Sequence, residues 1–181
     1  MYLTTIPFDS QDKYAQHQEV ARLFPKGSGR VLFTARSSGT LQVLSSTKRE
    51  GLACEEVKEY KEGDVVPFKI LFNPTKSVRL EKGGVKSRCT GILDTEEAAK
   101  WLTKQLEEKA GVKVVGVACV FQGTKKILKG GGVHAIVVQH MGVGMLTVED
   151  PSKFRVAMAN GFGKAKFAGY GMLDLWYAAQ G

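Results

Sequence analysis

The chain has 181 residues, 43% of them hydrophobic, which is enough for a real core in one ordinary domain or two small ones. It carries 26 Lys and Arg residues against 18 Asp and Glu, giving a formal charge of +8 and a pI near 9.4. This composition excludes a disordered or fibrous chain and favours a polyanionic partner.

Cysteine usage and apolar runs indicate the cellular setting. Cys54, Cys89 and Cys119 are scattered, odd in number and in no CxxC spacing, so we expect neither a disulfide framework nor a zinc site. The longest apolar run, VVGVACVF, is too short to span a bilayer, and no basic segment with a long apolar stretch begins the chain. We therefore expect a soluble, cytoplasmic protein.

The first half has the pattern of one ferredoxin-like unit. In chain order, we expect a strand at 1–8, a helix at 11–24, a hairpin at 31–46 that turns at Ser38-Gly39, and a strand at 66–78. Ser10 or Asp9 is the expected cap of the helix, and Pro25 ends it. Residues 48–64 are polar and ambiguous, and a short helix there would complete a β-α-β-β-α-β order.

The second half repeats this order without visible sequence identity. The elements we expect are a strand at 87–93, a helix at 94–111, strands at 112–121 and 133–148, a helix at 150–160 and a closing strand at 170–178. A basic hairpin tip at 123–132 carries Lys125, Lys126 and Lys129. The fold class is therefore α+β, with two tandem ferredoxin-like (RRM-like) domains and antiparallel sheets. We place the boundary in the Gly- and Lys-rich stretch between Arg79 and Arg88, which gives domains 1–84 and 85–181.

A glycine-rich loop, GFGKAKFAGYG, closes the second half. Its glycines are Gly161, Gly163, Gly169 and Gly171. A dinucleotide fingerprint would need a glycine where Lys166 stands, no Walker A sequence occurs, and Lys164 takes a place that an RNA-recognition strand gives to a stacking aromatic residue. Two interpretations remain: a loop whose backbone approaches a phosphate closely, or a turn with a bulged strand.

The candidate chemistry centres on histidine. His134 and His140 share a strand face with no third ligand nearby, so we expect satisfied polar residues and no metal site. Tyr14 and His17 are three apart on a helix, where a phenol and an imidazole could reach one scissile group. RNA supplies its own 2'-OH nucleophile, so a base, an acid and a cation suffice for cleavage without metal. Alternatively, the pair only edges the apolar stripe of the helix.

Three stretches of the chain stand out together: YAQHQEVARLFP (14–25), FKILFNPTKSV (68–78) and GFGKAKFAGYGMLDL (161–175). In their order and rough spacing they resemble one family, the CasE-type CRISPR-associated endoribonucleases of type I-E systems. The resemblance implies two tandem ferredoxin-like domains and metal-independent cleavage at the 3' base of a repeat stem-loop. The products would be a 2',3'-cyclic phosphate and a 5'-OH, and no cofactor would be needed.

The resemblance also implies roles for residues. His17 would be the general acid or base, Tyr14 would orient the reacting group or share the proton transfer, and the four loop glycines would shape the backbone. The residues expected to contact RNA are Lys76, Arg88, Lys125, Lys126, Lys129, Lys164 and Lys166. The chain is short for the family, with trimmed loops after Gly83 and Gly123, so the cationic roles depend on fewer matches than those of Tyr14 and His17.

The partners implied are a CRISPR repeat stem-loop and the other subunits of the type I-E surveillance complex. We expect the protein to remain on its product, and to be a monomer outside the complex. The chief alternative is a non-catalytic hairpin-binding subunit of the same fold, in which His17 is only structural. A more distant alternative reads single-stranded RNA by stacking.

Overall fold

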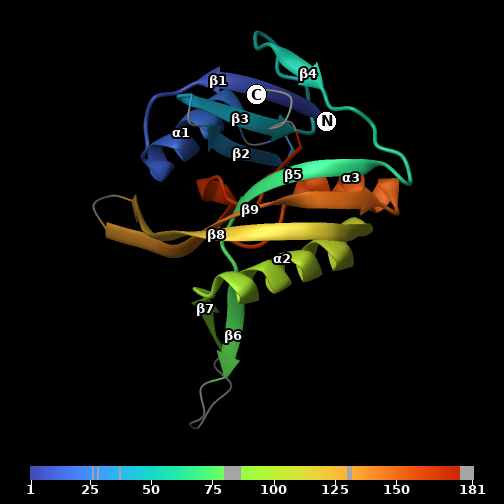
Figure 1. Ribbon diagram of the computed structural model, residues 1–181. Coiled ribbons are helices and arrows are strands. Elements are labelled where there is room, and N and C mark those ends of the chain that lie inside the picture. The colour runs from blue at the N-terminus through green and yellow to red at the C-terminus, as the bar shows by residue number, and fades with distance from the viewer. Residues whose placement is uncertain (26, 28, 37, 80–86, 130–131, 176–181) are drawn as a thin grey trace.

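The described part of the chain contains two four-stranded antiparallel sheets, a separate two-stranded sheet and three α-helices. The computed structural model describes residues 1–175 except 26, 28, 37, 80–86 and 130–131. In Figure 1 the first sheet, in blue, lies above the second, in green to orange. Within these residues, none of the helices has the length and apolar character needed to cross a membrane.

The first sheet is ferredoxin-like in strand order. Its elements are β1 (Tyr2–Pro7), α1 (Lys13–Leu23), β2 (Val31–Arg36), β3 (Thr40–Ser45) and β4 (Cys54–Glu56). The spatial order is β2-β3-β1-β4, which places the fourth strand beside the first and the third beside the second. The cap prediction for α1 was wrong: Asp12 is the cap and accepts from the Tyr14 N–H at 2.8 Å. Ser10 instead lies two residues before this cap, and its hydroxyl accepts from the Asp12 N–H.

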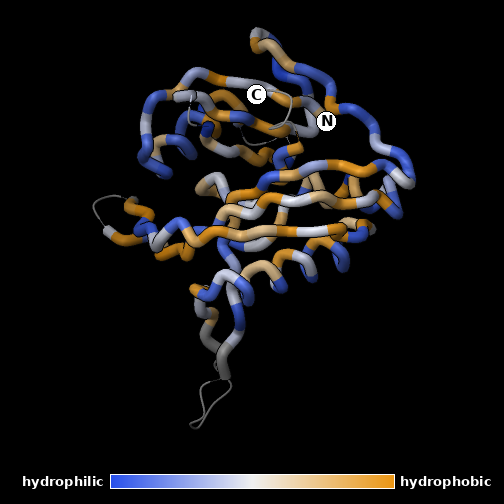
Figure 2. Tube along the Cα trace, viewed as in Figure 1, coloured by the Kyte–Doolittle hydropathy of each residue, from blue (hydrophilic) through white to orange (hydrophobic). Residues whose placement is uncertain are grey.

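Residues 48–64 contain no helix, contrary to the sequence expectation. They contain the short strand β4, which pairs with β1. The segment is hydrophilic along most of its length in Figure 2. Because a helix without an apolar stripe gains little from packing, this polar sequence serves as the edge strand and a connection instead.

The second sheet takes its first strand from the first half of the sequence. Strand β5 (Val65–Phe72) lies between β10 (Leu173–Asp174) and β9 (Gly132–Val148), with β8 (Val112–Lys129) at the far edge. The order β10-β5-β9-β8 is again ferredoxin-like, with α2 (Thr95–Ala110) and α3 (Pro151–Asn160) as its two helices. The predicted α+β class with tandem ferredoxin-like units is confirmed. The domain boundary at residue 84 stays a prediction, because 80–86 are outside the described residues, but the pairing assigns β5 to the second sheet.

The strand expected at 87–93 therefore has another role. Residues 75–79 and 87–91 form β6 (Thr75–Arg79) and β7 (Ser87–Gly91), a two-stranded hairpin between β5 and α2. It projects away from both sheets in Figure 1. In the second unit, β5 is the first strand, the place that the sequence predicted for residues 87–93. The predicted order of strands and helices is therefore kept, but its first strand comes from other residues.

Strands β8 and β9 form a long hairpin. Their pairing runs from Val112↔Val148 to Lys129↔Gly132, with irregularities at 114/116, 121/123 and 127/128. Residues 123–129 are thus strand rather than the loop that the glycines and lysines suggested. The closing strand is much shorter than 170–178: β10 has two residues, and 176–181 are outside the described part.

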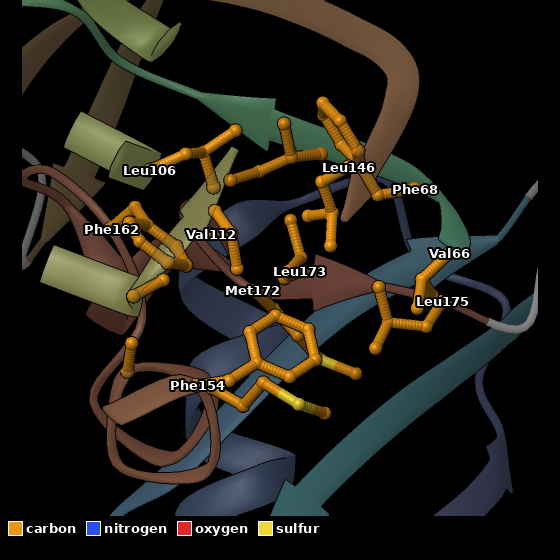
Figure 3. Packing of buried hydrophobic residues seen from close by; sticks show 14 of the residues in the cluster. Val66, Phe68, Leu106, Val112, Leu146, Phe154, Phe162, Met172, Leu173 and Leu175 are labelled. Carbon is orange, nitrogen blue, oxygen red and sulfur yellow. The ribbon is translucent and has the colours of Figure 1, made fainter. Parts of the chain in front are cut away.

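The main core fills the space between the second sheet and its helices and reaches the first sheet. Figure 3 shows Phe68, Leu106, Leu146, Phe154 and Met172 converging there, all at most 1% exposed. Leu3, Leu32 and Leu44 of the first sheet join this cluster. On the opposite face of that sheet, α1 packs against a second cluster through Val20 and Phe24. The first sheet is therefore packed on both faces.

One ion pair links the two sheets at their junction. Arg36 of β2 and Asp174 of β10 are 2.9 Å apart, with side chains only 14% and 6% exposed. Removing one partner of a buried pair leaves an uncompensated charge, so such pairs fix geometry more than they add net stability.

The glycine-rich loop at 161–171 passes around β2, the edge strand of the first sheet. A Cβ on Gly161 would lie 2.8 Å from Leu32, and one on Gly169 would lie 2.9 Å from Phe33. Leu32 and Phe33 are successive residues, so their side chains point to opposite faces of the strand. The loop therefore contacts both faces of one edge strand, and only backbone without Cβ atoms fits so close.

Gly163 and Gly171 serve contacts within the second unit. A Cβ on Gly163 would meet Trp101, and one on Gly171 would overlap the Phe162 carbonyl oxygen. All four glycines have positive φ values, between 65° and 82°. The Gly171 N–H donates to the Leu71 carbonyl at 2.7 Å, which ties the end of the loop to β5. Glycine is therefore required in this loop for two reasons: the positive φ values and the close contacts with neighbouring atoms.

We predict that Gly171→Ala destabilises the protein far more than Gly51→Ala. Both glycines have φ near +80°, but a Cβ at Gly51 meets nothing within 4 Å. The control should lose about 1 kcal/mol from the unfavourable φ alone, and Gly171→Ala more than about 3 kcal/mol, since overlap adds to it. Urea unfolding of both variants measures the difference. Equal losses would mean that the close approach has no energetic role.

Candidate active site

Tyr14 and His17 lie side by side on α1. Their ring centroids are 6.3 Å apart, with an angle of 39° between the planes, and both side chains are half-buried. The Asp12 cap holds the start of the helix, so Tyr14 sits in the first turn. The phenol and the imidazole thus form a pair that solvent, and hence a ligand, can reach.

The glycine-rich loop brings a third ring to this pair. Phe167, in the single 3₁₀ turn Lys166–Ala168 (η1), meets His17 edge-on at 6.0 Å between centroids. Its ring also meets His134 of β9 edge-on at 5.4 Å. Sequence reasoning found no link between His17 and His134. The link depends on a left-handed residue, Ala165 with φ 63°, which the sequence does not signal.

Lys13 also belongs to the site, and sequence reasoning missed it. Its ammonium lies over the Tyr170 ring, 5.6 Å from the centroid, and donates to Gln16 Oε1 at 3.3 Å. Lys13 precedes His17 by four residues, so both project from one side of α1. The spacing was visible in the sequence, but the aromatic partner comes from the glycine-rich loop.

The predicted RNA-binding lysines are distributed over several surfaces. Lys125 and Lys126 are neighbours in β8 and therefore face opposite sides of the sheet. Lys166 is half-buried, and burial lowers its pKa. Lys76 is in β6 and pairs with Glu97 at 2.7 Å. The side chains of Arg88 and Lys129 lie outside the described residues.

Lys164 lines a groove of about 620 Å³ beside Phe167. Residues from β6, β7, β9 and the glycine-rich loop form its walls, including Thr75, Cys89 and Ile136. The Lys164 ammonium lies 3.0 Å from the Cys89 sulfur. This hydrogen bond, with a second one from Thr75, lowers the pKa of the exposed Cys89 thiol.

His140 has a different environment from His17. It is fully buried, with Nε2 3.0 Å from the Ile92 carbonyl oxygen, and burial lowers its pKa. The neutral ring therefore donates to Ile92 and packs against Phe72 and Phe121. It is a core histidine inside the fold rather than the satisfied polar residue expected at a sheet margin, because its Nδ1 is buried without a hydrogen-bond partner among the described residues. Across the described ranges, no three His, Cys, Asp or Glu side chains gather as a metal site.

A comparison with protein families identifies the family of the chain. The family model described as CRISPR associated protein matches residues 1–176. The chain belongs to this family of CRISPR-associated proteins. A search of curated protein sequences gave no match.

Solved structures of similar fold include several CRISPR-associated proteins. Cas6e from Escherichia coli K-12 is 22% identical, with a TM-score of 0.76 over 96% of this chain and 98% of that one. Thermus thermophilus Cse3, bound to an RNA representing a pre-cleavage complex, is 19% identical, with a TM-score of 0.74 over 96% and 97%. A chain of E. coli Cascade bound to a double-stranded DNA target is 19% identical, with a TM-score of 0.61 over 96% and 97%. At this identity the likeness establishes the fold.

We predict that Cys89 reacts with iodoacetamide at lower pH than Cys119. Lys164 lowers the pKa of the Cys89 thiol, whereas burial raises that of Cys119 to about 11. Because the thiolate is the reacting form, alkylation of Cys89 should begin first as pH rises. Peptide mass spectrometry after timed labelling measures both sites.

Lys164→Gln separates charge from exposure in this experiment. It should slow the labelling of Cys89, while Lys166→Gln, two residues along the loop, should leave it unchanged. An unchanged rate in Lys164→Gln would contradict the ion-assisted hydrogen bond.

Proposed function

We propose that this chain is a metal-independent endoribonuclease that cleaves precursor CRISPR RNA at the base of the repeat stem-loop. It then remains bound to its product as a subunit of a CRISPR surveillance complex. The bond is cut by attack of the ribose 2'-OH on the adjacent phosphorus. The products are a 2',3'-cyclic phosphate and a 5'-OH.

The observation that carries this proposal is the accessible Tyr14–His17 pair in a member of the CRISPR-associated family. A histidine that serves only the core would resemble His140, which is fully buried and bonded to a carbonyl. His17 is instead half-buried and meets rings on two sides, at 6.3 Å and 6.0 Å. Those rings hold the imidazole in place without burying it.

The two side chains share the two proton transfers that the reaction needs. One removes the proton from the 2'-OH as the 2'-oxygen forms its bond to phosphorus. The other protonates the 5'-oxygen as the P–O5' bond breaks, so the atoms balance with no added reactant. Imidazole suits such transfers because its ordinary pKa is near neutral.

The similar structures support the choice of ligand and assembly. Cse3 is described as a CRISPR endoribonuclease and is bound to RNA in three of them, and two others are described as CRISPR RNA-guided surveillance complexes. The net charge of +8 favours an RNA partner through phosphate contacts. An A-form stem hides its base edges in a deep, narrow groove, so shape and phosphates dominate recognition.

We assign the RNA-contacting surface to the β8–β9 hairpin and the glycine-rich loop. Lys125 and Lys164 are exposed there, Lys126 is exposed on the opposite face of the hairpin, and Lys129 belongs to the same hairpin. The loop glycines shape this surface and take no part in the chemistry. Arg88 and Lys76 belong to the projecting hairpin, where Lys76 would have to leave Glu97 to reach a phosphate.

We predict that His17→Ala cuts the repeat hairpin of its own CRISPR array about 10²- to 10⁴-fold more slowly than wild type, the loss typical of an acid-base group. Binding should stay within a fewfold of wild type, because the imidazole makes no phosphate contact that holds the stem. Single-turnover cleavage of end-labelled RNA in EDTA measures the rate, and filter binding measures the affinity.

His134→Ala is the matched control. Both histidines touch the edge of Phe167, but only His17 lies beside Tyr14. The control should keep most of the rate, and Tyr14→Phe should lose a large part of it. If wild type binds the hairpin in EDTA and does not cut it, the chain is a hairpin-binding subunit and His17 is structural.

A further inference from the structure

Lys13 is held in place by contacts on two sides. Its ammonium donates to Gln16 Oε1, and the amide of Gln16, 1% exposed, donates in turn to the Ser10 carbonyl at 2.8 Å. On the other side lies the face of Tyr170, whose hydroxyl is 3.0 Å from Gln139 Oε1. A lysine usually moves freely in solvent, whereas Lys13 is held between Gln16 of its own helix and Tyr170 of the glycine-rich loop.

A second lysine, from β8, faces the same place. Lys125 stands opposite Val137, so the two side chains share one face of the hairpin. Val137 and Ile127 on that face pack against Tyr170. Lys13 lies over the Tyr170 ring, and Val137, the neighbour of Lys125, packs against that ring, so the two lysines lie on the same side of the molecule. Burial lowers the pKa of Lys13, and the charge of Lys125 lowers it further.

Neither lysine has a carboxylate partner in the part of the chain that the structure describes. The ion pairs found there involve other cations, from Arg22 to Arg155. A partly buried ammonium, that of Lys13, with the exposed ammonium of Lys125 near it and no counter-charge, would be stabilised by an anion. Gln16 accepts a hydrogen bond from the Lys13 ammonium, and the Tyr170 ring attracts its charge. Neither residue carries a negative charge that would neutralise the ammonium.

We propose that Lys13 and Lys125 form a phosphate-binding site for the RNA backbone. The site rests on the proposed function for the identity of its ligand. Because Lys13 lies one helical turn before His17, on the same side of α1, the bound group is the scissile phosphate or the one beside it. Lys13 is then a positioning residue that sets the RNA strand against Tyr14 and His17 by contacts from both ferredoxin-like units.

The first experiment measures the salt dependence of RNA binding. The probe is the repeat hairpin with a 2'-deoxy substitution at the cleaved nucleotide, so that binding is separated from cutting. Lys13→Gln and Lys125→Gln should each reduce the slope of log K against log salt by about 1, the loss of one phosphate contact. The double variant should lose less affinity than the product of the single losses, because one phosphate bridges both lysines.

Two controls define the comparison. Lys104→Gln removes the same charge from the exposed face of α2 and should leave the slope unchanged. Lys13→Arg keeps the charge and should retain the slope. The proposal of a bridging phosphate is wrong if Lys13→Gln leaves the salt slope as unchanged as Lys104→Gln does. It is also wrong if the affinity loss of the double variant equals the product of the two single losses.

The second experiment tests the site without RNA. NMR titration of the Lys13 side chain should give a higher pKa in Lys125→Gln than in wild type, because the neighbouring positive charge is gone. Inorganic pyrophosphate should raise the pKa of Lys13 in wild type, and less so in Lys125→Gln. A Lys13 pKa that pyrophosphate does not move would overturn the anion site even if the hairpin is cut.

The two experiments separate the two proposals. A protein that binds pyrophosphate at Lys13 but neither binds nor cuts the hairpin would retain the anion site and refute the proposed function. A protein that cuts the hairpin with an unaltered salt slope in Lys13→Gln would keep the function and refute the site.

Discussion

The contact between the glycine-rich loop and strand β2 determines how the two ferredoxin-like units meet. Gly161 leaves room for Leu32 on one face of β2, and Gly169 for Phe33 on the other. The same loop carries Phe167 to His17 and Tyr170 to Lys13. A side chain at either glycine would separate the loop from β2, and α1 would lose its aromatic neighbours. The geometry of the candidate site therefore depends on backbone packing at a distance from it.

Much of the fold could be predicted from the sequence because the local signals are strong. The helix beginning at Asp94 has a capping residue and an apolar face, and the structure has both. The pairing of β5 could not be predicted, since an apolar strand reads the same whichever sheet it joins. The length of β8 was missed because glycine and lysine near Gly123 resemble a turn, and only pairing with β9 settles it.

The candidate site likewise has one part that could be predicted from the sequence and one part that could not. The spacing of Tyr14 and His17 on one helix was sufficient to place them together, because the helical period fixes neighbours three residues apart. The contacts of Phe167 with His17 and of Tyr170 with Lys13 join segments that are far apart in sequence. They depend on a tertiary arrangement that includes a non-glycine residue, Ala165, in the left-handed region. No local sequence pattern predicts that a non-glycine residue adopts this conformation.

The place of β5 in the second sheet has a consequence for how the protein folds. A ribosome delivers β5 well before its partners β9 and β10, which begin only at Gly132 and Leu173. The apolar side chains of Phe68, Ile70 and Phe72, buried in the folded protein, therefore stay exposed until β9 and β10 have left the ribosome. Strand pairings between residues so far apart in sequence slow folding, and the unpaired apolar strands are prone to aggregation until they form. The second unit therefore cannot form until β9 and β10 have been made, and the contacts of the glycine-rich loop with α1 form only after that.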